Sequence, residues 1–120
     1  MKLLIVDDDP GISQMLIRVF SADGYEVETA PTGAEALEAL ASGNIGLALV
    51  DYHLDDMEAP AILEKAKENN WDIPIIVMSG LGEQKDTAQV LEQGAVALLD
   101  KPFDLMEIRG LVKDNWGEGI

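Results

Sequence analysis

The sequence contains no cysteine and only one histidine, His53. Without cysteine the chain cannot form a disulfide, use a thiolate nucleophile or build a cysteine-based zinc site. A single histidine also cannot supply a metal site made of several histidines. Carboxylates, hydroxyls and amines are therefore the side chains that remain for chemistry.

Basic residues are scarce, with 8 Lys and Arg against 23 Asp and Glu and a net charge of −15. A nucleic-acid binder needs a basic surface that displaces counterions from phosphates, so this balance argues against direct DNA or RNA binding. The same charge argues against docking on anionic lipid. A phosphorylated ligand is attracted only where a local cation reverses the field.

Long hydrophobic runs are missing as well. The apolar run at the N-terminus stops at three aspartates, residues 7–9, and is too short for a signal-peptide core or a membrane span. The sequence therefore predicts a cytoplasmic protein without membrane contact. Its 120 residues, 48% of them hydrophobic, predict one domain over residues 1–120 with one sizeable core.

Short apolar runs alternate with amphipathic helical patterns along the chain. The runs, typical of strands buried on both faces, cover residues 2–6, 25–29, 47–50, 74–78 and 96–99. The helical patterns cover residues 10–23, 32–42, 59–69, 83–93 and 104–115. Asp9, Thr32 and Asp104 stand where helix N-caps are expected.

This alternation predicts a parallel sheet, because right-handed crossovers place the helices on its two faces. A closed eight-unit barrel would need about twice the length. We expect an α/β fold with a doubly wound, five-stranded parallel sheet in the order 2-1-3-4-5, a flavodoxin-like three-layer sandwich. Ligands of such sheets bind beyond the carboxyl ends of the strands.

Polar residues follow four of the five predicted strands. They are Asp7 and Asp8 after the first, Asp51 after the third, Ser79 after the fourth, and Asp100 and Lys101 after the fifth. In the predicted order these four strands are neighbours, about 4.8 Å apart, so the side chains form one cluster. Asp9 is better explained as a turn or cap residue.

Clustered carboxylates repel one another, and a hard divalent cation with oxygen ligands relieves that repulsion. Magnesium suits such a site and leaves positions open for phosphate oxygens. A metal, a carboxylate nucleophile, a hydroxyl and a lysine are the parts needed for phosphoryl transfer through an aspartyl phosphate. Asp51, between the acidic end and the Ser79 and Lys101 ends, is the best-placed acceptor.

At these residues the chain resembles the receiver domain of two-component response regulators. The segments LLIVDDDP, LALVDYHL, PIIVMSG and GAVALLDKPF carry the resemblance, which covers essentially the whole chain. It implies that Asp51 accepts a phosphoryl group from a sensor histidine kinase or a phosphotransfer protein. It also implies a magnesium site with Asp8 and Asp51 as ligands, Asp7 acting through water, and the backbone carbonyl of His53.

The resemblance implies further that Ser79 and Lys101 contact the phosphoryl oxygens, and it is compatible with a cis Lys101–Pro102 bond. Phosphorylation would then rearrange the surface of helix 4, strand 5 and helix 5, which would contact an output domain or a second copy. Beyond its own phosphorylation and dephosphorylation, such a domain turns over no separate substrate. Apolar residues on the last two units fit either a partner face or core packing: Val90, Leu98, Ile108, Leu111 and Val112.

The chain departs from the family pattern at several positions. Leu98 replaces the aromatic residue usual three positions before the lysine, and Asp55 and Ala59 replace the common Pro and Gly after the acceptor. The usual aromatic switch is therefore in question. His53 and Leu81 occupy positions that flank the phosphoryl group in the family, so the lifetime of phosphorylated Asp51 should respond to His53→Asn or Leu81→Glu.

Three other functions fit parts of the pattern. A small magnesium-dependent phosphatase would need an acid two residues after its nucleophile, where this chain has His53, and a substrate-enclosing cap. A receiver-like module that works by protein contact alone is compatible with Leu98, Asp55 and Ala59. A flavin carrier is disfavoured, because the three acids after the first strand would repel the cofactor phosphate. The sequence leaves open the kinase, the output partner and whether the chain stands alone.

Overall fold

The structure, a computed structural model, describes residues 1–80 and 88–116 of the chain. The strands are β1 (Lys2–Val6), β2 (Val27–Ala30), β3 (Ile45–Asp51), β4 (Ile75–Ser79) and β5 (Ala97–Asp100). The helices are α1 (Pro10–Ala22), α2 (Gly33–Ala41), α3 (Ala59–Glu68), the 3-10 helix η1 (Ala88–Leu91) and α5 (Leu105–Asn115). Within these described ranges, none of the helices has the length and apolar character needed to cross a membrane.

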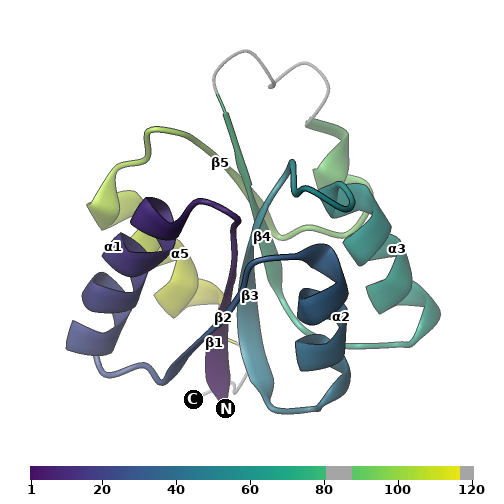
Figure 1. Ribbon diagram of the computed structural model, residues 1–120, viewed down its shortest axis with the longest axis horizontal. Helices are drawn as coiled ribbons and strands as arrows, with labels where there is room; N and C mark the ends of the chain where they lie inside the picture. The colour runs from purple at the N-terminus through teal and green to yellow at the C-terminus, as the bar shows by residue number, and fades with distance from the viewer. Residues whose placement is uncertain (81–87, 117–120) are drawn as a thin grey trace.

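The five strands form one parallel sheet in the order β2-β1-β3-β4-β5, as the sequence predicts. Helices α1 and α5 cover one face of the sheet, and α2 and α3 cover the other (Figure 1). Because all strands run the same way, their carboxyl ends meet at one edge. The predicted α/β three-layer architecture is therefore confirmed.

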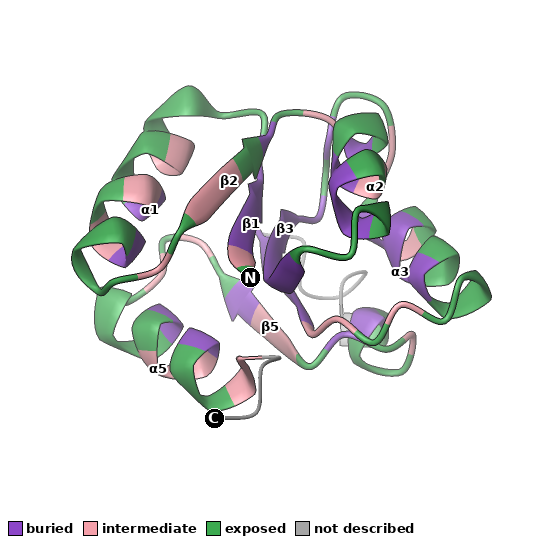
Figure 2. Cartoon of the chain, turned by 90° about the horizontal axis from the view of Figure 1, so that it is seen from below, coloured by how far each residue is buried: buried purple, intermediate pink, exposed green. Residues whose placement is uncertain are grey.

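Alternate residues of the central strands feed two separate cores, one on each face. The α2 and α3 side includes Leu4, Val6, Ala48, Val50, Ile62 and Val77. The α1 and α5 side includes Leu3, Leu16, Phe20, Leu49, Met78 and Ile108. Figure 2 shows the result, with the helices buried on their inner sides and exposed on their outer sides. Burial on both faces explains the continuous apolar runs of the strands.

The five apolar residues assigned either to a partner face or to the core belong to the two cores. Val90, Ile108 and Val112 are buried. Leu98 and Leu111 are partly buried and pack against the same clusters. Core packing therefore accounts for these side chains.

Helix N-caps stand where the sequence predicts them. The Asp9 carboxylate accepts hydrogen bonds from the backbone N–H groups of Gly11 and Ile12. Thr32 Oγ1 accepts from Glu35 N at 3.2 Å, and Asp104 Oδ1 accepts from Met106 N at 2.8 Å. Each cap satisfies amide groups that lack a partner inside the first helical turn.

The Asp9 cap gives a first testable prediction. Asp9→Ala should lower the free energy of unfolding by about 1 kcal/mol, because two amide groups of α1 lose their acceptor. Urea unfolding measures the loss, and Asp9→Ser, which keeps a capping oxygen, should recover most of it. A cost equal in the alanine and serine variants would contradict the capping role.

Three element predictions differ from the structure by more than one residue, and one of them is the third strand, which begins at Ile45 instead of residue 47. The second strand begins at Val27 instead of residue 25, because the chain turns at Gly24 and the Tyr25 ring packs between Phe20 and Trp116. The helix predicted over residues 83–93 is observed only as the 3-10 turn Ala88–Leu91. Residues 92 and 93 form a turn, and residues 83–87, which include most of the expected helix 4 surface, lie outside the described residues.

Candidate functional site

The carboxyl edge of the sheet gathers the predicted site residues. Asp51 is the last residue of β3 and lies beside Met78 of β4 in the strand register. Ser79 ends β4 and is the register partner of Asp100, the last residue of β5. Asp7 and Asp8 follow β1, the other neighbour of β3. Polar groups from four adjacent strands therefore meet at one edge.

Asp7, Asp8 and Asp51 form a group of converging carboxylates. Each offers an oxygen, and the three oxygens lie within 4.8 Å of one another. Asp7 is held in place by the Asp9 backbone N–H, which donates to Asp7 Oδ1 at 2.9 Å. The carboxylate oxygens of the three aspartates are hard ligands, the type that Mg²⁺ prefers. The donor set therefore fits a magnesium ion.

Lys101 lies between two of the three acids. Its Nζ is 3.1 Å from Asp7 Oδ2 and 3.1 Å from Asp51 Oδ1. Burial alone would lower the pKa of Lys101, but the negative charges of Asp51 and Asp7 outweigh burial and raise that pKa. The ammonium is therefore a fixed positive charge inside an acidic cluster. The peptide bond that follows, Lys101–Pro102, is cis, as expected.

Asp51 is an unusual carboxyl group. Its side chain is only 12% exposed. Burial, followed by the charge of Asp7, raises the pKa of Asp51 to about 6, although Lys101 pulls it down. Protons and cations therefore compete for this carboxylate close to neutral pH, which suits an acid that must be ionised to act.

Ser79 is at the same edge and has a partner that sequence reasoning did not identify. The residue is fully buried, and its hydroxyl donates to Asp100 Oδ1 at 3.0 Å. Asp100 stands directly before Lys101 in the sequence, where it looks like one more acid at a strand end. The register pair Ser79 and Asp100 is the signal that could have identified it, once the strand order was known.

The loop after β3 forms a small hairpin around His53. The His53 and Glu58 backbones form an antiparallel bridge, and Leu54 N donates to Met57 O at 3.0 Å. Within this bridge His53 Nδ1 lies 2.7 Å from Glu58 Oε2. Glu58 is the N-cap residue of α3 but makes no side-chain capping bond. The hairpin thus holds the His53 backbone and ring next to the end of β3.

The same loop fastens α2 to the site. Asp56 Oδ1 accepts from Gly33 N at 2.8 Å, and Asp56 Oδ2 accepts from Ala34 N at 3.0 Å. These two bonds lower the pKa of Asp56. Met57 fills the space beside Gly33, where an added Cβ would meet its Cγ, Sδ and Cε atoms. The contact joins residues more than twenty positions apart, so the helical pattern of α2 does not reveal it.

Asp55, two residues after His53, faces the acidic cluster. The charge of Asp8, together with a hydrogen bond between the two side chains, raises the pKa of Asp55. Leu81, the other residue expected to flank the phosphoryl group, lies outside the described residues.

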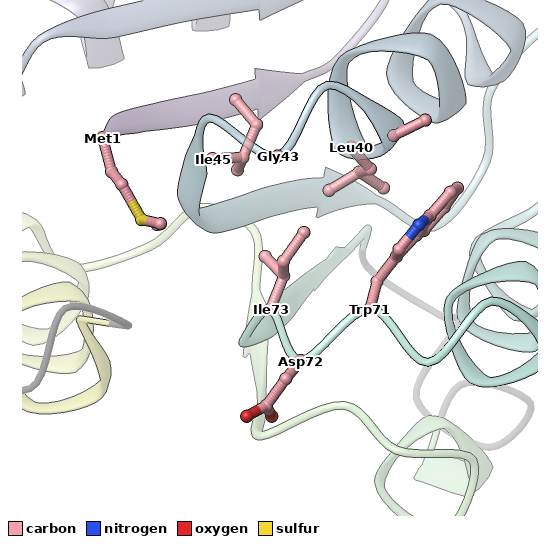
Figure 3. Close-up of a pocket in the computed structure, with 9 residues that line it drawn as sticks. Met1, Leu40, Gly43, Ile45, Trp71, Asp72 and Ile73 are labelled. Carbon is pink, nitrogen blue, oxygen red and sulfur yellow. The ribbon is translucent and has the colours of Figure 1, made fainter.

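A separate hollow lies at the opposite edge of the sheet. Figure 3 shows its lining, which includes Met1, Leu40, Ile45, Trp71 and Ile73, with Asp72 the one charged residue among those labelled. Its volume is about 220 Å³. The lining is largely apolar and lies beside the starts of β1, β3 and β4, so it is distinct from the carboxylate cluster.

Comparison with known proteins places this geometry in a family. The sequence-family model of the response regulator receiver domain matches residues 3–113. The chain belongs to the response regulator receiver domains. Receiver domains of two-component systems are phosphorylated on aspartate and interact with histidine kinases or phosphotransfer proteins.

Relatives of this receiver domain differ in length. It is 37% identical to sporulation initiation phosphotransferase F of Bacillus subtilis (strain 168), covering 93% of this chain and 90% of that protein. It is 33% identical to the transcriptional regulatory protein PmrA of Pectobacterium parmentieri, covering 98% of this chain and 54% of PmrA. The receiver domain therefore spans about half the length of that second relative.

A solved structure supports the same assignment. The receiver domain of the Francisella response regulator 1452 superposes on this receiver domain with a TM-score of 0.90 at 25% identity. The match covers 99% of this chain and 98% of the other.

Proposed function

We propose that residues 1–120 act as a phosphorylation-controlled signalling domain in which Asp51 accepts a phosphoryl group from a sensor histidine kinase or a phosphotransfer protein. The observation that carries the proposal is the position of Lys101, 3.1 Å from both Asp7 and Asp51 within the carboxylate cluster. A fixed cation beside a buried acid lets a phosphate dianion approach an otherwise acidic protein. The name of one relative, sporulation initiation phosphotransferase F, agrees with phosphoryl transfer.

In this proposal an ionised Asp51 oxygen attacks phosphorus, while the bond from phosphorus to the donor nitrogen of phosphohistidine breaks. Lys101 compensates negative charge on the phosphoryl oxygens, and the Ser79 hydroxyl donates to one of them. Water later attacks the aspartyl phosphate, which releases inorganic phosphate and restores the carboxylate. The domain turns over no separate substrate.

The proposal includes a magnesium ion held by Asp8 and Asp51, by Asp7 through water, and by the His53 backbone carbonyl. When bound, Mg²⁺ neutralises charge on the acids and on the phosphoryl oxygens. The three carboxylates within 4.8 Å of one another support this site. We propose that phosphorylation alters contacts of helix 4, β5 and α5 with an output domain or a second copy, in the cytoplasm.

The decisive experiment is incubation with acetyl phosphate and Mg²⁺, followed by intact mass measurement. The wild-type chain should gain one phosphoryl group, and Asp51→Asn should gain none. Asp9→Ala, a neighbouring acid with a capping role, serves as the matched control and should be phosphorylated like wild type. A wild-type chain that gains no phosphoryl group would favour a module that works by protein contact alone.

Magnesium binding makes a separate prediction about stability. At a Mg²⁺ concentration ten times its dissociation constant, the free energy of unfolding should rise by about 1.4 kcal/mol, because the ion binds only the folded cluster. Asp8→Ala should abolish the rise. Thermal or urea unfolding with and without Mg²⁺ measures it, and Ca²⁺-free buffer with a chelator sets the baseline. An equal response in Asp8→Ala and wild type would exclude Asp8 as a ligand.

A further inference from the structure

The hydrogen bond between Ser79 and Asp100 joins the ends of two adjacent strands. Ser79 is fully buried, and its hydroxyl donates to Asp100 Oδ1 at 3.0 Å. The two residues are register partners in the ladder between β4 and β5. A hydroxyl has one proton to donate. While that proton is bound to Asp100, it is not available to a second acceptor.

A backbone hydrogen bond also joins these two strand ends. Lys101 N donates to Ser79 O at 2.7 Å, which extends the strand pairing by one residue. Lys101, the next residue after Asp100, contacts Asp51 at 3.1 Å through its Nζ. Asp100, the last residue of β5, therefore contacts the Ser79 hydroxyl, and Lys101, the next residue, contacts the Asp51 carboxylate.

We propose that Asp100 is a positioning residue that holds the Ser79 hydroxyl in the unphosphorylated domain and releases it when Asp51 carries a phosphoryl group. The inference rests on the proposed function, in which Ser79 donates to a phosphoryl oxygen. To make that bond, the hydroxyl must first break its bond with Asp100. Asp100 thus stabilises the unphosphorylated arrangement and has no corresponding bond to Ser79 after transfer.

Because the Ser79–Asp100 bond is present only before transfer, it should affect the rate of phosphorylation and not the rate of hydrolysis. Breaking the Ser79–Asp100 bond adds to the barrier for phosphorylation, because the bond exists before transfer and is absent once the hydroxyl has turned to the phosphoryl group. Hydrolysis starts from the phosphorylated state, where the bond is already broken. Removing the Asp100 carboxylate should therefore speed phosphorylation and leave hydrolysis nearly unchanged, a split that general loosening of the fold would not produce.

The test compares Asp100→Ala with wild type, using acetyl phosphate and saturating Mg²⁺. Phosphorylation should become about fivefold faster, the factor that corresponds to one ordinary hydrogen bond. Hydrolysis, followed after removal of acetyl phosphate, should stay within about twofold of wild type. Phosphorylation that is equal to or slower than wild type in Asp100→Ala would overturn the inference while leaving the proposed function intact.

Two further variants separate the hydrogen bond from the charge of Asp100. Asp100→Asn keeps an oxygen acceptor but loses the charge, so it should be slower than Asp100→Ala and return most of the way to the wild-type rate. If Asn and Ala accelerate equally, repulsion of the phosphate dianion explains the gain and the inference fails. In a Ser79→Ala background, Asp100→Ala should have no effect on the rate. A wild-type domain that is never phosphorylated would overturn both proposals.

Discussion

Lys101→Ala is expected to lower the free energy of unfolding by about 2 kcal/mol at pH 7.5 without Mg²⁺. The ammonium is the positive charge that lies 3.1 Å from both Asp7 and Asp51. The Asp7 side chain is fully buried, and the Lys101 side chain is 20% exposed. Removing one partner of a largely buried ion pair leaves the other charge without compensation, and the partial exposure of Lys101 moderates the cost.

Magnesium should restore much of that loss, because the ion would replace the missing positive charge. Urea unfolding of Lys101→Ala and wild type, with and without Mg²⁺, measures both effects. Lys113→Ala is the matched control, since Lys113 is an exposed residue near the end of α5. If Lys101→Ala and Lys113→Ala destabilise the domain equally, the ion pairs at the site contribute little.

Asp51→Asn is expected to stabilise the Mg²⁺-free domain by about 2 kcal/mol at pH 7.5. The folded pKa of Asp51 is about 6, against 3.8 for an ordinary aspartate. Ionising Asp51 is therefore costlier in the folded chain than in the unfolded chain, and each pKa unit corresponds to about 1.4 kcal/mol. The figure of 2 allows for the partial exposure of the carboxylate.

Because folding raises the pKa of Asp51, the stability advantage of Asp51→Asn should depend on pH. Because the folded pKa is the higher one, stability linked to Asp51 is fully present below about pH 4 and is lost as pH rises through about 6. The advantage of Asp51→Asn should thus be near zero at pH 4 and reach its full value above pH 7. Unfolding at a series of pH values tests this, and an advantage independent of pH would contradict the raised pKa. Added Mg²⁺ should reduce the advantage, since the ion binds the wild-type carboxylate better.

The strand order and the converging acids were predictable because they depend on repeating features of the sequence. Continuous apolar runs, such as Leu47 to Val50, require burial on both faces, and parallel strands place their carboxyl ends at one edge. Once Asp7, Asp51 and Lys101 are assigned to strand ends, their proximity follows from the sheet order. Each cap residue likewise acts within its own turn, so Asp9 and Thr32 could be assigned locally.

Contacts between side chains of different elements could not be predicted in the same way. Asp56 reaches the first turn of α2, and Glu58 turns to His53 instead of capping α3. Both acids resemble ordinary loop residues in the sequence, because their partners are decided by how the loop folds back. The start of β2 was also misplaced, since Tyr25 is apolar enough for a strand but packs its ring against Phe20 and Trp116.

The two hydrogen bonds between Asp56 and the first turn of α2 offer a direct spectroscopic reporter. Both carboxylate oxygens of Asp56 accept hydrogen bonds from backbone N–H groups, those of Gly33 and Ala34, and Asp56 lies only five residues after Asp51. Amide chemical shifts respond strongly to the geometry of such bonds. Glycine resonances occupy a sparse region of a nitrogen-proton correlation spectrum, so in an isotopically enriched sample the Gly33 signal would report changes in the loop without any attached probe.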